Sequence, residues 1–222
     1  MSARRWIPYL SSVSAVGAAP RPWDARLGRR LVAPLKDSWV TPNHLTTVRL
    51  IVGLVGALAF TPGSWGWSNV GALLVILSNF LDHTDGELAR ISGKTSRIGH
   101  LYDLASDALV TILLFCCIGI GVAASGTRAM PFGLPAALMG AMAGTAVALI
   151  FYLRMRIEAL LGKAGTRQSS LAGFETEDVL YLLPLVTLFG ALTPFLLAAS
   201  VGAPLFALRV IVDFVRVTRR AG

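Results

Sequence analysis

Six apolar stretches follow one another along the 222-residue chain, and each is long enough, or nearly so, to cross a bilayer. A transmembrane helix needs about 20 apolar residues to span about 30 Å of hydrocarbon. Hydrophobic residues make up 55% of the sequence and charged residues only 14%, which excludes an ordinary soluble domain. We therefore expect an all-α integral membrane protein with six transmembrane helices, at residues 45–61, 68–89, 101–124, 133–153, 178–191 and 193–215.

Basic residues are concentrated in alternate connecting segments, and this pattern favours six crossings over five. The N-terminal segment, the loops after the second and fourth stretches, and the C-terminus are rich in Lys and Arg, whereas the other loops carry only Arg128. The positive-inside rule then places both termini in the cytoplasm, which requires an even number of crossings. The net charge of +8 reflects this bias. No basic stripe interleaved with aromatic residues indicates nucleic-acid binding, and we expect a multi-pass protein of the inner cell membrane.

Two parts of the chain are expected to differ in role: an N-terminal cytoplasmic segment, residues 1–40, and a six-helix transmembrane domain, residues 41–222. Within the first part, the spacing of apolar and basic residues from Trp23 to Leu35 predicts an amphipathic helix in the headgroup plane. Thr41-Pro42-Asn43 should break this helix before the first crossing. The apolar patch at residues 6–10 is too short for a signal peptide. Pro184 predicts a tilt or kink in the short fifth crossing.

Four aspartates, Asp82, Asp85, Asp103 and Asp107, lie in the second and third apolar stretches. Residues three and four apart share one helix face, so these side chains should form two carboxylate pairs on two neighbouring helices. Carboxylates in a low-dielectric setting repel one another and are costly to desolvate, whereas a hard divalent cation binds oxygen ligands. The sequence therefore predicts a metal site for Mg²⁺ or Mn²⁺.

Small residues and one arginine surround the aspartates. Gly86 and Ala89 leave helix surface without bulk beside the predicted metal site, and Gly99 lies one turn before Asp103. Arg90 presents a planar fork that suits a phosphate or diphosphate. A lone intramembrane aspartate is more often half of an ion pair, and Gly-Ala spacing more often serves helix packing. Four aspartates without a matching number of bases favour a functional site.

The pattern Asp82-x2-Asp85-Gly86-x2-Ala89-Arg90-x8-Gly99-x3-Asp103-x3-Asp107 resembles the signature of the CDP-alcohol phosphotransferase (CDP-alcohol phosphatidyltransferase) family at every fixed position. These are integral membrane enzymes of phospholipid synthesis. The segment Thr41-Pro42-Asn43-x-Leu45-Thr46, followed by Arg49, is similar to the start of the first transmembrane helix in that family. Six crossings with both ends in the cytoplasm are also the topology that the resemblance implies.

The resemblance implies that a hydroxyl attacks the β-phosphorus of a CDP-linked alcohol and that CMP is released. It assigns two divalent ions, Mg²⁺ or Mn²⁺, to the aspartates, with Asp107 also acting as the base for the acceptor hydroxyl. Paired metals and a nearby carboxylate suit such a displacement. The implied donor is CDP-diacylglycerol, with a soluble donor of the CDP-inositol type as the alternative, and the implied assembly is a homodimer. The residues implied to line the CDP pocket are Gly86, Ala89, Arg90, Gly99, Asn43 and Thr46.

The acceptor is less constrained. Arg154, Arg156, Arg209 and Lys94 are candidates for binding a phosphorylated polyol such as inositol phosphate or glycerol phosphate. Lys163 and Arg167 could contribute too, although Glu175, Glu177 and Asp178 would repel an anion unless they pair with these bases. A divalent-cation transporter is the alternative from another class; it predicts acidic residues through the whole membrane depth and an internal duplication, and the sequence has neither.

The remaining polar and small residues have structural explanations. The three histidines, His44, His83 and His100, form no His-x-x-x-His pair and are expected to be structural. For His83 and His100, which are close to the aspartates, a role in supporting the metal ligands is the alternative. The adjacent cysteines at 116 and 117 are expected to be packing residues. Gly140-x-x-x-Gly144 fits a dimer interface and packing within one chain equally well.

Overall fold

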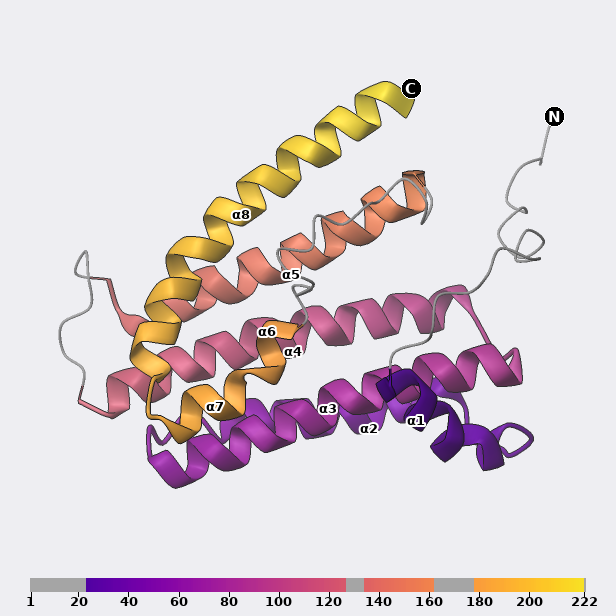
Figure 1. The fold of residues 1–222 in the computed structure, drawn as a ribbon, viewed down its shortest axis with the longest axis horizontal. Helices are drawn as coiled ribbons and strands as arrows, with labels where there is room; N and C mark the ends of the chain where they lie inside the picture. Colours follow the sequence, from indigo (N-terminus) through magenta and orange to yellow (C-terminus); the bar gives the residue numbers. More distant parts are fainter. Residues whose placement is uncertain (1–22, 127–133, 162–177, 222) are drawn as a thin grey trace.

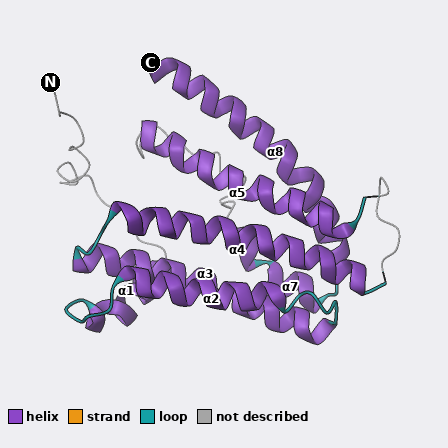
Figure 2. Cartoon of the chain, turned by 180° about the vertical axis from the view of Figure 1, so that it is seen from behind, coloured by secondary structure: helices purple, strands orange, loops and turns teal. Residues whose placement is uncertain are grey.

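A computed structural model describes residues 23–126, 134–161 and 178–221, and in these ranges it contains helices and no strand (Figures 1 and 2). Predictions about other residues, including the absence of a signal peptide and the roles of Lys163, Arg167, Glu175 and Glu177, lie outside the described residues. The elements in chain order are α1 (Trp23–Val32), the 3-10 turn η1 (Ala33–Leu35), α2 (Pro42–Leu58), α3 (Trp65–Ser92), α4 (Arg97–Ala124), α5 (Ala136–Leu161), α6 (Asp178–Tyr181), α7 (Leu183–Leu188) and α8 (Leu192–Ala221).

The N-terminal part contains the predicted helix and the predicted break. Together α1 and η1 cover residues 23–35, and α1 packs against α3, where an added Cβ at Gly28 would lie 3.3 Å from Thr84 Cγ2. Thr41 is extended (φ −108°, ψ 158°) and precedes Pro42 as the first residue of α2. His44 Nδ1 accepts a hydrogen bond from the Thr41 backbone N–H at 3.2 Å. This histidine therefore has the structural role expected of it; a position of α1 at the membrane surface stays a prediction.

The long helices lie roughly side by side, in the order α3 and α2, α4, α5 and α8 across the molecule (Figure 1). Helix α2 packs against both α3 and α4, whereas α3 and α4 do not pack directly on each other along their described lengths. An added Cβ at Gly53 of α2 would lie 2.8 Å from Ser78 Oγ of α3 and 2.9 Å from Val110 Cγ1 of α4. The two aspartate helices are therefore neighbours across a gap rather than in direct contact, because the glycine lets α2 pack between them.

Helices α4, α5 and α8 are each long and apolar enough to cross a membrane, as in a membrane protein. The predicted fifth crossing is described only as the short helices α6 and α7, which break at Leu182 just before Pro184, where a kink was expected. The count of six crossings and the orientation stay predictions.

The predicted fourth crossing is described as α5, which continues to Leu161 and so includes Arg154 and Arg156. Gly140 and Gly144 lie on its face toward α4. A Cβ added at Gly140 would lie 2.1 Å from the Phe115 carbonyl oxygen, and one at Gly144 would lie 2.9 Å from Ile112 Cα. The glycine pair thus packs within the chain and is not available as a dimer interface.

Candidate functional site

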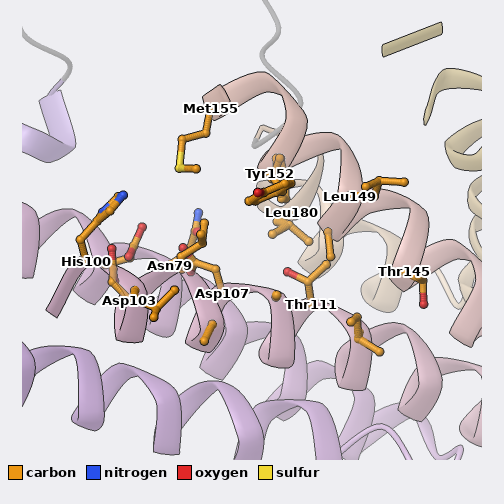
Figure 3. A pocket seen from close by; sticks show the side chains of 18 residues that line it. Asn79, His100, Asp103, Asp107, Thr111, Thr145, Leu149, Tyr152, Met155 and Leu180 are labelled. Carbon is orange, nitrogen blue, oxygen red and sulfur yellow. The ribbon is translucent and has the colours of Figure 1, made fainter. Parts of the chain in front are cut away.

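A cavity of about 600 Å³ opens between the middle of α3, the first half of α4, α5 and α6 (Figure 3). Asp82, Asp103 and Asp107 line one part of it, together with Asn79 and His100. The rest of the wall is mainly apolar. It is formed by the remaining lining residues Leu101, Leu104, Ala105, Ala108, Thr111, Ile112, Thr145, Ala148, Leu149, Phe151, Tyr152, Met155 and Leu180. Ligand pockets commonly have volumes of about 300–1,000 Å³ and combine apolar walls with a few polar groups.

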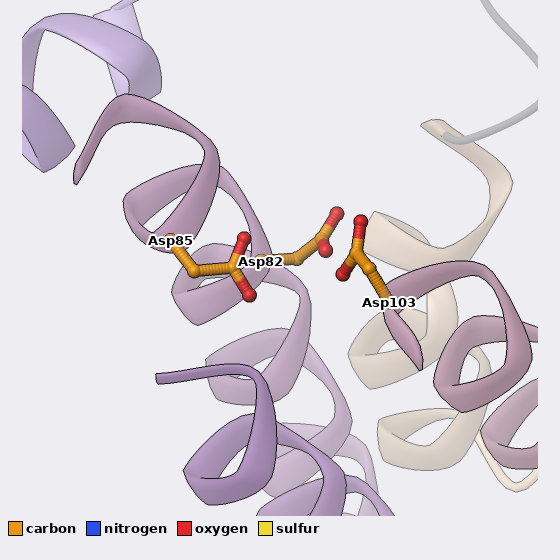
Figure 4. A group of neighbouring side chains, drawn as sticks. All are labelled: Asp82, Asp85 and Asp103. Atoms are coloured by element: carbon orange, nitrogen blue, oxygen red, sulfur yellow. The ribbon is translucent and has the colours of Figure 1, made fainter. Parts of the chain in front are cut away.

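The four aspartates come together because a tight turn joins the two helices that carry them. Gly93, in the left-handed conformation (φ 67°), ends α3, and Ser96 caps α4 by accepting a hydrogen bond from the Gly99 N–H at 2.9 Å. One carboxylate oxygen from each of Asp82, Asp85 and Asp103 lies within 4.8 Å of the others. Figure 4 shows these side chains meeting across the gap between α3 and α4.

Arg49 of α2 fills the floor of this gap and contacts all four carboxylates. Its Nε lies 3.1 Å from Asp82 Oδ1 and 3.3 Å from Asp85 Oδ2. Its Nη2 lies 2.6 Å from Asp103 Oδ1, and its Nη1 lies 2.5 Å from Asp107 Oδ1. The side chain is only 3% exposed. From the sequence, Arg49 was assigned only to the pattern at the start of a helix, although an arginine inside an apolar stretch is itself a signal that a partner exists.

The cluster keeps an excess of negative charge. One guanidinium carries a single positive charge against four carboxylates, so ionised side chains leave a formal charge of minus three. Mg²⁺ and Mn²⁺ prefer such hard oxygen ligands. Ligands on opposite sides of Mg²⁺ are about 4 Å apart, close to the spacing of the three aspartates. The residues present therefore fit a divalent cation, with Asp107 beside them.

The predicted CDP contacts divide into two groups. Gly86 is open, since an added Cβ there would meet no atom within 4 Å, and Ala89 follows it on the half-buried face of α3. Gly99 is not open: an added Cβ would lie 2.7 Å from Asn43 Oδ1, so Asn43 occupies the predicted gap. Thr46 Oγ1 donates a hydrogen bond to Asp85 Oδ2 at 2.8 Å and thus orients that buried carboxylate.

Arg90 has a buried partner, Glu87, that is not among the site residues predicted from the sequence. Its side chain is 67% exposed, and its Nη1 donates a hydrogen bond to Glu87 Oε1. Glu87 is only 1% exposed, and its Oε2 has no hydrogen-bond partner in the described part of the chain. The buried Glu87 carboxylate thus holds the exposed Arg90 guanidinium in place.

The four acceptor candidates are not among the residues that line the cavity. Lys94 Nζ donates a hydrogen bond to the Ser38 carbonyl oxygen at 2.6 Å and so ties the α3–α4 turn to the segment before α2. The Arg154 guanidinium lies 5.1 Å from the centre of the Phe206 ring of α8. Arg156 and Arg209 are exposed. Their roles as acceptor contacts stay predictions.

Two enzymes are similar in sequence to more than half of the chain. A bifunctional IPC transferase and DIPP synthase of Rubrobacter xylanophilus is 33% identical over 168 residues, which are 75% of this chain and 35% of the relative. A phosphatidylinositol phosphate synthase of Cutibacterium acnes is 30% identical over 136 residues, covering 59% of this chain and 62% of the relative. The chain therefore spans about a third of the Rubrobacter protein.

The fold resembles that of a solved enzyme. The crystal structure of Mycobacterium tuberculosis phosphatidylinositol phosphate synthase with CDP-DAG bound matches with a TM-score of 0.58 at 24% identity, covering 88% of this chain and 94% of that chain. The same protein in complex with manganese and citrate matches with a TM-score of 0.55 at 23% identity, over 89% and 88% of the two chains. The family model of the CDP-alcohol phosphatidyltransferases matches residues 39–215, and the chain belongs to this family.

Proposed function

We propose that the chain transfers a phosphatidyl group from CDP-diacylglycerol to a hydroxyl acceptor and releases CMP, with divalent metal ions at the aspartates. The observation that carries this proposal is that four carboxylates from α3 and α4 surround one arginine, and that three of them, Asp82, Asp103 and Asp107, line one cavity. A relative's solved structure has CDP-DAG bound, and another contains manganese. The apolar wall of the cavity favours a lipid-linked donor over a soluble one, because acyl chains can lie against it.

Asp82, Asp85, Asp103 and Asp107 would hold two ions, Mg²⁺ or Mn²⁺. When bound, such ions neutralise the diphosphate and increase the reactivity of its phosphorus. Gly86, Ala89 and Arg90 would contact the cytidine diphosphate, the first through open backbone and the last through its exposed guanidinium. The other side of the CDP pocket would be formed by Gly99, Asn43 and Thr46.

Asp107 is the proposed general base. Its carboxylate is 44% exposed, lines the cavity (Figure 3) and is held by Arg49 through one oxygen, so its other oxygen can take a proton. The acceptor oxygen forms a bond to the β-phosphorus, the bond from that phosphorus to the CMP oxygen breaks, and the hydroxyl proton moves to Asp107. A positioned base of this kind typically contributes about 10²- to 10⁴-fold in rate.

The proposed acceptor is a phosphorylated polyol such as inositol phosphate or glycerol phosphate. Relatives named phosphatidylinositol phosphate synthase and archaetidylinositol phosphate synthase of Pyrococcus horikoshii, the latter 28% identical over 92 residues, support this class. Arg154, Arg156, Arg209 and Lys94 are the proposed phosphate contacts. We place the site at the cytoplasmic face of the inner membrane. A homodimer is part of the proposal, without an assigned interface.

CMP release by the purified full chain tests the function. The assay uses Mn²⁺ or Mg²⁺, CDP-diacylglycerol and a panel of polyol phosphates; a CDP-inositol arm tests the soluble donor. Asp107→Asn should lower turnover by about 10²-fold or more and still bind the donor. The matched control is Asp213→Asn on α8, whose side chain is 49% exposed and lies 3.7 Å from the Arg216 guanidinium. The absence of CMP with every donor and acceptor, or full turnover by Asp107→Asn, would contradict the proposal.

A further inference from the structure

Arg49 joins two helices that do not pack on each other. Its guanidinium contacts Asp82 and Asp85 on α3 and Asp103 and Asp107 on α4, and its Nη2 also donates a hydrogen bond to the Asp103 carbonyl oxygen at 3.1 Å. The arginine backbone is itself fixed, because Ser78 Oγ of α3 donates a hydrogen bond to the Arg49 carbonyl oxygen at 2.8 Å. The side chain thus bridges the gap across which the carboxylates meet.

The contacts use one oxygen of each carboxylate. Arg49 contacts Oδ1 of Asp82, Asp103 and Asp107, and Oδ2 of Asp85. Both hydrogen bonds from the guanidinium to these side chains go to one oxygen each, Asp107 Oδ1 and Asp103 Oδ1. A carboxylate has two oxygens with about four acceptor sites, so each aspartate can accept from Arg49 and still bind an ion.

A planar guanidinium is suited to this arrangement. It presents five N–H donors in a rigid fork and remains charged. Its Nη1 and Nη2 donate hydrogen bonds to the two carboxylates of α4, and its Nε lies beside the two carboxylates of α3. A lysine ammonium is a compact charge on a flexible stem and cannot contact both helices with the same geometry. The requirement is therefore for the shape of the group as well as for its charge.

We infer that Arg49 is a positioning residue that holds the four carboxylates at the spacing the metal ions require, through one oxygen of each, and leaves the second oxygens to the ions. The ionic part of this inference rests on the proposed function. Without Arg49, the carboxylates would repel one another until divalent ions replaced the lost charge. The folded state of an Arg49 variant therefore depends on metal more strongly than that of the wild type.

Thermal unfolding of the full chain in detergent tests this dependence. The free thiols of Cys116 and Cys117 report unfolding through a maleimide dye, with Mn²⁺ or with EDTA. We expect the Tm difference between Mn²⁺ and EDTA to be about 10 °C larger in Arg49→Gln than in the wild type, the scale expected when one partner of a buried ion pair is removed. Arg49→Lys should lie between the two.

Thr187→Val is the control, because it removes the hydrogen bond of a buried threonine to Asn69 Oδ1 at 3.0 Å and leaves Arg49 and the carboxylates in place. It should lower Tm equally in Mn²⁺ and EDTA. If Arg49→Gln does not fold in EDTA but folds in Mn²⁺, the inference is supported; if it folds in neither, Arg49→Lys decides. If the Tm difference between Mn²⁺ and EDTA in Arg49→Gln or in Arg49→Lys equals that of the wild type, the inference about Arg49 is overturned. If the wild type itself has the same Tm in Mn²⁺ and in EDTA, the proposed metal site and the inference are overturned together.

Discussion

The substitution Gly86→Ala tests the stability of α3 and the space proposed for the donor separately. Gly86 lies one turn after Asp82, and a Cβ built on it meets no atom of the described chain within 4 Å. Gly86→Ala should therefore fit the protein alone without any shift of its neighbours. Alanine is also more stable than glycine inside a helix by about 0.5–1 kcal/mol. At about 2–4 °C per kcal/mol for a chain of this length, we expect Tm to rise by about 1–4 °C.

The same methyl group should weaken donor binding. In the proposed complex the cytidine diphosphate lies against the Gly86 backbone, and a methyl group forced into an occupied space costs about 1–3 kcal/mol. Each 1.4 kcal/mol corresponds to a tenfold change in affinity. The donor Kd of Gly86→Ala should therefore rise by about 5- to 150-fold. A variant that is more stable and yet binds its donor more weakly cannot be explained by misfolding.

Thermal unfolding and a donor titration measure the two effects. Gly202→Ala on α8 is the control, because this glycine also has no atom within 4 Å of an added Cβ and lies outside the site. It should show a similar rise in Tm and an unchanged donor Kd. A wild-type donor Kd in Gly86→Ala would refute the approach of the donor to this backbone. A lower Tm would refute the conclusion that the position is open.

Three other substitutions test separate contacts. Thr46→Val removes the hydrogen bond to Asp85 and should cost about 1.5–3 kcal/mol and weaken Mn²⁺ binding; wild-type values in unfolding and Mn²⁺ titration would contradict this. Gly140→Ala places a Cβ against a carbonyl oxygen of α4 and should lower Tm by about 2–12 °C, with the oligomeric state unchanged in light scattering. A changed oligomeric state at constant Tm would instead indicate a dimer interface at this glycine. Glu87→Gln removes the anionic partner of Arg90 and should raise the donor KM with the fold retained; an unchanged KM would show that Arg90 acts without this partner.

Local signals account for what the sequence predicted well. Apolar length sets the helices, and the predicted third and sixth crossings, 101–124 and 193–215, lie within α4 and α8. Pro42 at the start of α2 and Gly93 at the end of α3 act through their own backbone preferences. The three- and four-residue spacing of the aspartates follows from helix geometry alone. These features require no knowledge of which helix packs on which.

The features that the sequence did not predict depend on contacts between distant segments. The position of α2 between α3 and α4 depends on Gly53, whose lack of a side chain has meaning only beside Ser78 and Val110. The cavity wall includes Tyr152 and Met155 of α5, about 50 residues after the aspartate motif. Asn43 was predicted to contact CDP, and its packing on Gly99 likewise joins two separate helices.

Helix α2 determines both the space and the charge of the site. Because it separates α3 from α4, the carboxylates meet across a gap that has room for ions, and the small Gly53 sets how closely α2 approaches the two helices. Arg49 lies one turn from Gly53 and reaches the same gap. Its single positive charge leaves the four carboxylates with a net formal charge of minus three, so two divalent ions would bring the net charge of the site to plus one. A site with this charge attracts a diphosphate, whereas a second arginine in the gap would compete with the ions for the same oxygens.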